Sequence, residues 1–436
     1  RAFWEQKVGR ETALGVVRPV PQALNVQYAF LVPKPHAKTL ADSFRMVVDG
    51  KRWNVVTPRR TGVYLDWRAI VANLPQGSYA FALDLTQAFS QLLVDPECQE
   101  QFAFATPRGP MASTRMPMGW TAAPMELERR MRGIFRDLLD QGLVMWVDNL
   151  YFRSPTFVGM RDMLAQVLRR CAQYNVILKP SSTVVGLGEV DFIGMRLGPS
   201  WWRKQGDVSA FRNAPLTTVA DLGKVVGALG FMEGSLPGLR VKLDPLIKIR
   251  TAGHKLAGGS DKLKASKVRL EQVGWNADHA RLVSTLWDEV EAGVAMSLPT
   301  NQGVLVLMTD ASDSGYGFML GEADEAELAK PAEDRKVRVL YVDSGVFKDN
   351  ELNWTVTERE LWPYMVAFTK CRAFWEGRPV RGFTDHKDLV PLLNNPDTLE
   401  KTTSVARVKR WIATLQGMDL HLEYVQGETN LLPDLL

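Results

Sequence analysis

The sequence predicts an α+β protein that ends in a separate α/β domain. Over the first two hundred residues, short β-type runs such as 79–85 and 143–152 are mixed with helical stretches such as 124–139. From about residue 201 to 298 the strand signals fade and helical ones dominate, and strands return after Gln302. We therefore expect three parts, over 1–200, 201–300 and 301–436.

The later elements follow from periodicity and from breaker residues. In the helical connector we expect helices over 219–232 and 279–296, with a Gly/Ser/Lys-rich break at 257–267. In the C-terminal part we expect a helix that begins at Thr357, a helix near 405–415, and strands over 304–309, 337–342, 382–385 and 420–425. Strands and helices in this order favour a domain with its own sheet.

Composition excludes several classes of protein. With 436 residues, 46% of them hydrophobic, the chain is too long for one core. It has no apolar run long enough to span a bilayer, no signal-peptide core, no fixed-period repeat, and no Walker, GxGxxG, HExxH or GxSxG motif. Cys98, Cys171 and Cys371 lack zinc or disulfide spacing. We expect an intracellular protein with reduced thiols.

A basic stretch stands out against the mild net charge of +4. Its cations are Lys242, Lys248, Arg250, Lys255, Lys262, Lys264, Lys267 and Arg269, and the acids within it are Asp244 and Asp261. Such a block can neutralise phosphates of a nucleic acid. A solvated face without a partner explains the charge equally well.

Two aspartates follow apolar runs in the first part. Asp84 comes after Tyr-Ala-Phe-Ala-Leu, and Asp148 comes after Leu-Val-Met-Trp-Val, so each is expected where a buried strand emerges. Acids on neighbouring strands can hold two divalent cations roughly 4 Å apart, which phosphoryl transfer requires. Taken alone, each aspartate is more often a turn or cap residue.

The residues around these acids carry a family resemblance. The ordered segments are 44–54 (FRMVVDGKRWN), 83–89 (LDLTQAF), 116–119 (MPMG) with Ala123-Pro124, 146–149 (WVDN), 191–194 (DFIG), 216–218 (LTT) and 243–246 (LDPL). In order and spacing they resemble the motifs of reverse transcriptases, specifically those of gypsy-class LTR retrotransposons. The resemblance implies a right-hand polymerase, with fingers and palm over 1–200 and thumb and helical connector over 201–300.

The resemblance also implies roles for single residues. Asp84 and Asp148 would bind two Mg²⁺ ions, with Mn²⁺ as an alternative, and would be catalytic together with Asn149. The substrate-binding residues would be Lys34 and Arg45 at the triphosphate, Phe89 as the gate against a 2′-hydroxyl, and Met118 and Gly119 at the nascent base pair. Phe192 and Gly194 would belong to the primer grip. Each has a plain structural alternative: Arg45 as an exposed strand residue, Gly119 as a turn glycine and Phe89 as a core residue.

The chain departs from the family pattern in the metal box. Asp148 is followed by Asn149 where the family has a second aspartate, Trp146 stands for Tyr, Met118 for Phe or Gln, and Ser182 for an expected lysine. An amide oxygen can still bind Mg²⁺, but losing one charge beside two cations in a poorly screened site costs several kcal/mol. We therefore expect a weakened polymerase site.

A second set of acids lies in the C-terminal part. Asp310 ends a strand, Glu360 lies in the first turn of a helix, Asp385 ends another strand, and Asp434 lies near the end. Thr357 and Glu360 also fit a capping box, which is a sufficient structural reason for that glutamate, and Asp434 fits a helix N-terminal acid. In their flanking residues the four acids resemble the metal ligands and catalytic residues of the retroelement ribonuclease H domain, which implies an α/β ribonuclease H-like domain over 301–436, C-terminally truncated.

The first functional hypothesis is an RNA-directed DNA polymerase with ribonuclease H activity, using two Mg²⁺ per site. Its expected partners are an RNA template, a DNA or tRNA primer, an RNA–DNA hybrid and deoxynucleoside triphosphates, with no membrane. The alternative is a retroelement-derived protein that binds nucleic acid as a scaffold, or a decayed copy, whose polymerase is silent. A third hypothesis combines these two: the polymerase is silent and only the nuclease is active. Because the chain starts at Arg1 without Met, we expect a fragment of something longer. The resemblance implies a polyprotein that also carries protease, integrase or capsid segments, in a cytoplasmic particle or the nucleus.

Overall fold

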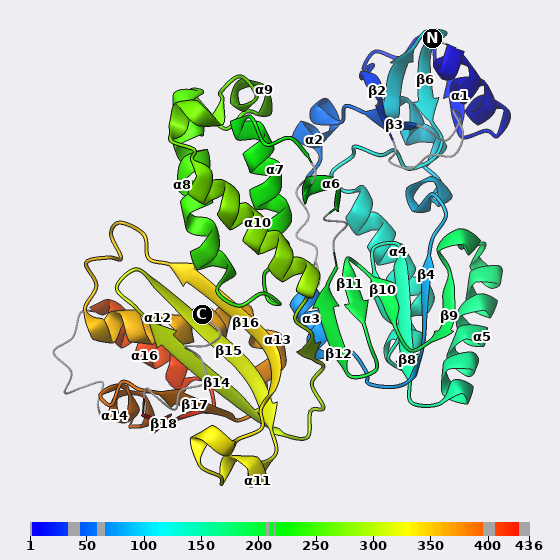
Figure 1. Ribbon diagram of the computed structural model, residues 1–436. Coiled ribbons are helices and arrows are strands. Elements are labelled where there is room, and N and C mark those ends of the chain that lie inside the picture. The colour runs from blue at the N-terminus through cyan, green and yellow to red at the C-terminus, as the bar shows by residue number, and fades with distance from the viewer. Residues whose placement is uncertain are drawn as a thin grey trace. The chain divides into compact units, whose positions relative to one another are not determined.

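The computed structural model describes residues 2–33, 44–58, 66–205, 209–212, 214–395 and 406–426. They form two compact units (Figure 1), the first of residues 1–65 and 77–188 and the second of residues 66–76 and 189–436. The second unit therefore includes 66–76, a segment that lies within the expected fingers and palm. No helix in the described ranges has the length and apolar character needed to cross a membrane.

The first unit is centred on a four-stranded antiparallel sheet. β4 (Tyr79–Asp84) pairs with β8 (Asn149–Ser154) and β9 (Val184–Leu187), and β7 (Val144–Trp146) completes the order β7-β8-β4-β9. Helices α4 (Ala123–Leu139) and α5 (Phe157–Tyr174) pack against it. Phe81, Phe135, Leu150 and Val167 are buried in the core that these elements share, as the amphipathic pattern of both helices requires.

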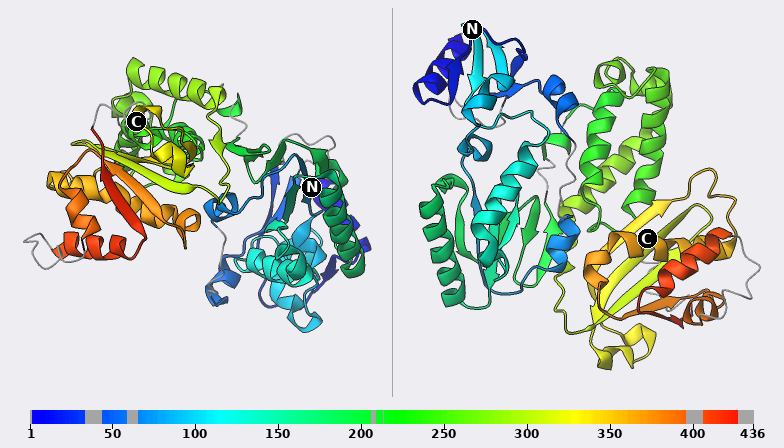
Figure 2. Two further views of the ribbon diagram at one scale, coloured as in Figure 1. Left: turned by 90° about the horizontal axis from the view of Figure 1, so that it is seen from below. Right: turned by 180° about the vertical axis from the view of Figure 1, so that it is seen from behind.

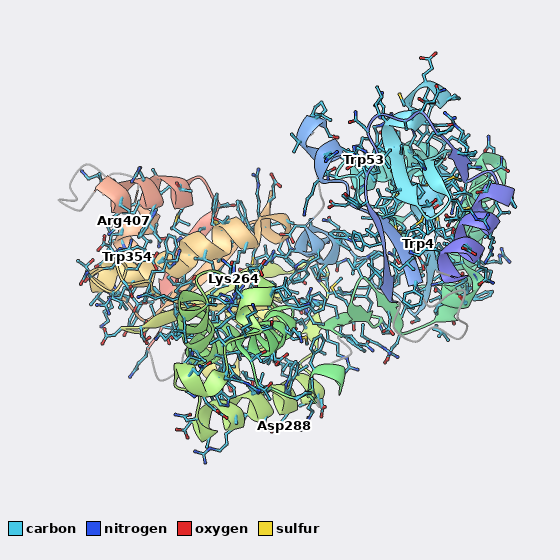
Figure 3. The ribbon with its side chains drawn as sticks, turned by 90° about the horizontal axis from the view of Figure 1, so that it is seen from above. Trp4, Trp53, Lys264, Asp288, Trp354 and Arg407 are labelled. Carbon is cyan, nitrogen blue, oxygen red and sulfur yellow. The ribbon has the colours of Figure 1, made fainter. Side chains whose placement is uncertain are left out.

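The rest of the first unit has two smaller sheets. They are ordered β1-β6-β5 and β2-β3. The elements are α1 (Ala2–Ala13), β1 (Val17–Pro19), β2 (Ala29–Pro33), β3 (Phe44–Val48), α2 (Lys51–Val56), η2 (Ala88–Gln91), η3 (Pro96–Phe102), β5 (Ala103–Thr106), β6 (Gly109–Ser113) and η4 (Pro180–Ser182). Trp53 and Trp4, labelled in Figure 3, share a small second core with Val48 and Phe104.

The second unit begins with a sheet and a helical bundle. β10 (Val190–Phe192), β11 (Met195–Leu197), β12 (Trp201–Lys204) and β13 (Met296–Ser297) pair in that order. The helical elements are α3 (Trp67–Ala72), α6 (Ser209–Arg212), α7 (Val219–Gly230), α8 (Leu239–Leu256), α9 (Lys262–Ala265), η5 (Leu270–Val273) and α10 (Ala277–Ala292). Leu222, Leu243 and Trp287 are buried between α7, α8 and α10.

The second unit ends in a five-stranded sheet with helices (Figure 2). The strand order is β16-β15-β14-β17-β18, with the β14–β17 and β17–β18 pairs parallel. The elements are β14 (Val304–Ala311), β15 (Gly315–Ala323), α11 (Glu325–Leu328), η6 (Ala332–Asp334), β16 (Arg338–Val346), α12 (Val356–Lys370), α13 (Arg372–Trp375), β17 (Val380–Thr384), α14 (Leu389–Asn394), α16 (Ala406–Gln416) and β18 (Leu420–Tyr424). The predicted α+β class is confirmed.

Three local expectations were wrong. The run 143–152 is a hairpin, not one strand, because Val147 adopts a positive φ of 52° and reverses the chain between β7 and β8. The helix expected from Thr357 starts at Val356, with Thr355 as its N-cap. The connector carries strands at both ends, β12 and β13, where only helices were expected.

Candidate functional site

The acids of the first sheet gather where β4 meets β8. Asp84, the last residue of β4, lies opposite Asn149, the first residue of β8. Asp148 occupies the turn before β8, and its carbonyl accepts a hydrogen bond from the Leu85 amide at 3.0 Å. The antiparallel register thus brings Asp84, Asp148 and Asn149 to one edge of the sheet.

Two contacts modify this acidic edge. The Asn149 side-chain amide donates to Asp148 Oδ1 at 3.2 Å, so the amide meets the neighbouring carboxylate as a donor. Lys179 Nζ lies 3.5 Å from Asp84 Oδ2, and the Lys179 backbone amide donates to the Asp84 carbonyl at 2.7 Å. Sequence reasoning missed Lys179. A lysine was expected at Ser182, and Lys179 lies only three residues before it. Its relevance to Asp84 becomes visible only in the folded structure.

The predicted substrate-binding residues take different positions in the first unit. Phe89 lies in η2, half-buried against the central core. Gly119 has φ of 111°, and a Cβ there would lie 2.2 Å from the Val48 carbonyl oxygen, so the close approach requires glycine. Half-buried Met118 precedes it. Arg45 pairs with Val32 on β3, and Lys34 lies outside the described residues.

The predicted primer-grip residues belong to the second unit. Buried Phe192 ends β10, and Ile193 and Gly194 form the turn to β11 with positive φ of 44° and 74°. A Cβ on Gly194 would lie 2.7 Å from the Phe231 ring. Lys204 Nζ lies 4.5 Å from the centre of that ring, and burial lowers the pKa of this ammonium to about 8.

A second acidic cluster lies on the C-terminal sheet. Met308 of β14 pairs with Phe383 of the parallel strand β17, so Asp310 and Asp385, each two residues further on, reach the same edge. Helix α12 packs on β14 and β15 and contributes Glu360. Burial, Asp385 and Asp310 raise the pKa of Glu360 to about 8, and burial and Asp385 raise the pKa of Asp310. The three carboxyl groups are therefore close enough to repel one another electrostatically. Asp434 lies outside the described residues.

The cluster suits a hard cation chemically. Glu360 is 9% exposed, and its Oε2 atom is buried without a hydrogen-bond partner in the described part of the chain. Below this edge the Tyr364 hydroxyl donates to the Phe383 carbonyl at 3.1 Å. Within the described ranges, no three or more His, Cys, Asp or Glu side chains stand together as a group that could hold a metal ion. Oxygen donors and an unsatisfied carboxylate nevertheless fit Mg²⁺.

The N-cap of α12 does not involve Glu360, so helix capping does not explain this glutamate. Thr355 Oγ1 accepts from the Glu358 amide at 3.3 Å, and the Glu358 carboxylate accepts from the Thr355 amide at 2.9 Å. The capping box is therefore Thr355–Glu358, and the predicted Thr357–Glu360 box was wrong. Arg407 pairs with Glu358 and lies 4.7 Å from the Trp354 ring centre (Figure 3), which ties α16 to this helix start.

The chain is similar to known proteins over most of its length. Residues 32–197 match the family described as "Reverse transcriptase (RNA-dependent DNA polymerase)", and residues 301–418 match "RNase H-like domain found in reverse transcriptase". Over 430 residues the chain is 24% identical to the Retrovirus-related Pol polyprotein from transposon opus of Drosophila melanogaster, covering 97% of this chain and 40% of that protein. The polyprotein of transposon 297 from the same organism is 23% identical over 416 residues, covering 93% and 35%. The chain thus spans less than half the length of these relatives.

The fold is similar to that of a solved structure. The foamy viral protease-reverse transcriptase in complex with RNA/DNA hybrid superimposes with a TM-score of 0.77 at 18% sequence identity, covering 97% of this chain and 53% of that one. A likeness at this identity shows the fold. Together with the two family matches, it shows that this chain is a reverse transcriptase domain followed by an RNase H-like domain, in the arrangement of a retrotransposon or retroviral Pol polyprotein.

Proposed function

We propose that the chain is an RNA-directed DNA polymerase joined to a ribonuclease H, from a gypsy-class LTR retrotransposon. The observation that supports the polymerase is the β4–β8 register, in which Asp84 lies opposite Asn149, the residue after Asp148, at one edge of the first sheet. These two carboxylates would hold Mg²⁺, which when bound stabilises the attacking and leaving oxygens of phosphoryl transfer. The similarity of the two Drosophila transposon polyproteins supports the class.

Other residues of the chain would bind the substrates. Arg45 and Lys34 would neutralise the triphosphate, Phe89 would exclude a 2′-hydroxyl, and Met118 and Gly119 would lie at the new base pair. Phe192 and Gly194 would contact the primer. The partners would be an RNA template, a DNA or tRNA primer, deoxynucleoside triphosphates and an RNA–DNA hybrid, the ligand named for the foamy viral relative.

The nuclease would use the carboxylates on β14, α12 and β17. Asp310, Glu360 and Asp385, with Asp434, would hold the cations and cleave the RNA strand of the hybrid. The raised pKa of Glu360 supports this assignment, because burial and then the neighbouring Asp385 and Asp310 disfavour its negative charge, which a bound cation would compensate.

A second candidate is a silent polymerase that keeps the nuclease. It is favoured by Asn149, whose amide donates to Asp148 and so occupies an acceptor site of a proposed metal ligand. In the family pattern a third carboxylate stands at this position. The charge difference is one unit beside two cations, which is enough to slow the polymerase strongly.

Primer extension on an RNA template separates the two candidates. Asn149→Asp should raise the extension rate by roughly 100-fold, which corresponds to about 3 kcal/mol of transition-state stabilisation. Asp84→Asn should abolish extension, and cleavage of a labelled hybrid by the same proteins should be unchanged. Extension by the natural chain that survives Asp84→Asn would contradict the assigned site. No extension until Asn149→Asp restores it would establish the silent polymerase.

A further inference from the structure

The chain turns sharply between Asp84, at the end of β4, and Phe89. Strand-type pairing continues beyond β4 as far as Thr86, whose amide donates to the Ile177 carbonyl at 2.9 Å. Gln87 then takes left-handed backbone angles, φ 46° and ψ 49°, and turns the chain into η2. Phe89 therefore lies on a short helix that is set off from the strand carrying Asp84.

One side chain closes this turn from its far end. Gln91 is the last residue of η2, and its Nε2 donates to the Thr86 carbonyl at 2.6 Å and to the Ile177 carbonyl at 2.9 Å. Its Oε1 accepts from the Ile177 amide at 2.9 Å. The Gln91 carboxamide thus pairs with Ile177 as a peptide group does in an antiparallel pair of strands. We call these three hydrogen bonds the Gln91 clamp.

The segment that the clamp grips is itself fixed within the first unit. It follows α5, which packs against β4 (Figure 1), and Val176 is buried in the central core. Leu178 pairs with Leu85 in an isolated bridge, and the Thr86 hydroxyl donates to the Leu178 carbonyl at 3.0 Å. Gln91 therefore ties η2 to backbone that packing and pairing already hold in place.

Other contacts hold η2 less firmly. It is a 3-10 helix of four residues, and a helix this short has little stability of its own. Ala88 is buried but small, and Phe89 is only half-buried against the central core. The position of the Phe89 ring relative to Asp84 therefore depends on the Gln91 clamp.

We propose that Gln91 is a positioning residue for nucleotide selection. Its carboxamide holds η2 against the end of β4, so that the Phe89 ring stays where a 2′-hydroxyl would collide with it. The inference rests on the proposed polymerase and on the proposed gate role of Phe89, and it assigns Gln91 to act through that ring. A misplacement near 1 Å can change a rate about 100-fold, so loss of the clamp should admit ribonucleoside triphosphates.

The test is the ratio of kcat/KM for a deoxynucleoside triphosphate to kcat/KM for the matching ribonucleoside triphosphate. Single-nucleotide incorporation on a primed RNA template is measured for the natural chain, Gln91→Met and Gln87→Met. Gln87→Met is the matched control because Gln87 is exposed in the same turn and, among the described residues, its side chain makes no hydrogen bond to the start of η2. Misfolded protein lowers both kcat/KM values equally, so a purely structural loss does not change the ratio.

Gln91→Met should lower the ratio by about tenfold or more, and Gln87→Met by less than about twofold. Phe89→Val/Gln91→Met should have the same ratio as Phe89→Val alone, because the clamp acts through the ring. An unchanged ratio in Gln91→Met, beside a lowered one in Phe89→Val, would overturn the inference and leave the polymerase in place. Effects that multiply in the double variant would overturn it as well.

Failure of the proposed function gives a different result. Each protein is also prepared with Asn149→Asp, so that a slow natural site does not hide the comparison. If no protein of either set extends a primer, the polymerase assignment fails and the inference fails with it. If Phe89→Val leaves the ratio unchanged, the gate assignment fails, again with the inference.

Hydrogen exchange examines the clamp without activity. The Ile177 amide, which donates to Gln91 Oε1, should exchange about tenfold faster in Gln91→Met than in Gln87→Met. Equal exchange rates would contradict the clamp. If Gln91→Met is unfolded by circular dichroism, Gln91→Glu takes its place. That variant keeps an acceptor for the Ile177 amide, loses both donated hydrogen bonds, and should also lower the ratio.

Discussion

Glu360 makes the stability of the metal-free protein depend on pH. Its pKa of about 8 lies above the ordinary value of a glutamate, so the stability linked to its protonation is complete below about pH 4.3 and is lost as pH rises through 8. In EDTA we expect the free energy of unfolding to fall between pH 5 and pH 9 by more in the natural chain than in Glu360→Gln, with a difference on the order of a few kcal/mol, and the melting temperature to fall with it.

Magnesium should reverse this loss. At the proposed nuclease site the cation would compete with the proton for the same carboxylate, so the gain in melting temperature on adding Mg²⁺ should be larger above pH 8 than near pH 5. Glu360→Gln should gain less at either pH. If the natural chain and Glu360→Gln followed one melting curve across the whole pH range, the carboxyl group would not be the titrating residue.

Lys179 should compete with the cation at the proposed polymerase site. Its ammonium lies 3.5 Å from Asp84, but both side chains are partly exposed, at 48% and 25%, so the pair contributes at most about 1 kcal/mol. Lys179→Gln should therefore lower the Mg²⁺ concentration for half-maximal primer extension by up to about fivefold. Lys224→Gln, which removes a lysine paired with Asp221, is the control. A higher Mg²⁺ requirement in Lys179→Gln would mean that the lysine assists catalysis.

At the scale of elements, the start of α12 shows which of two overlapping capping patterns forms the N-cap. Thr355 and Glu358 hydrogen-bond reciprocally, whereas Thr357 lies inside the helix. Thr355→Ala should cost about 1 kcal/mol of unfolding free energy, whereas Thr357→Ala should raise the unfolding free energy by up to a few tenths of a kcal/mol, because Ala has the higher helix propensity. Urea unfolding curves of the two variants give the comparison. The reverse order of stabilities would restore the cap predicted from the sequence.

This helix also shows what the sequence could and could not predict. Both Thr355–Glu358 and Thr357–Glu360 fit the same capping pattern, and the reciprocal hydrogen bonds of Thr355 and Glu358, together with the Arg407 contact, distinguish them. The strand end at Asp84, and the one next to Asp310, could be predicted from the sequence because apolar runs precede these residues. The β7–β8 turn was not, because Val147 and Asp148 lack the glycine that usually marks a hairpin. Lys179 meets Asp84 across 95 residues, and local patterns carry no such information.

At the scale of the whole molecule, a partly buried ionic network joins four stretches of the second unit. Glu233, after α7, accepts from Lys370 of α12 at 2.6 Å, and Arg68 of α3 lies 3.5 Å from the same Glu233 oxygen. Lys370 also pairs with Asp343 of β16, and the Arg68 guanidinium donates to the Tyr341 hydroxyl at 3.1 Å. The segment 66–76 is thereby tied to the RNase H-like domain, which explains its place in the second unit.

Removing Lys370 should be costly because of Asp343. The Asp343 carboxyl is 2% exposed, and burial raises its pKa even though Lys370 opposes that rise. Lys370→Met leaves this acid and Glu233 without their shared partner and should cost about 3–5 kcal/mol. Lys330→Met, which breaks an exposed pair with Glu327, should cost less than about 1 kcal/mol.

A double-mutant cycle completes the argument. Asp343→Asn removes the stranded charge, so Lys370→Met/Asp343→Asn should recover a large part of the loss, with a coupling energy above about 1 kcal/mol in urea unfolding. Strictly additive effects would show that the lysine and the aspartate do not interact. Because Arg68 of α3 lies against the same Glu233 oxygen as Lys370, Lys370→Met should also make the 66–76 segment more susceptible to proteolysis, whereas Lys330→Met should leave its cleavage rate unchanged.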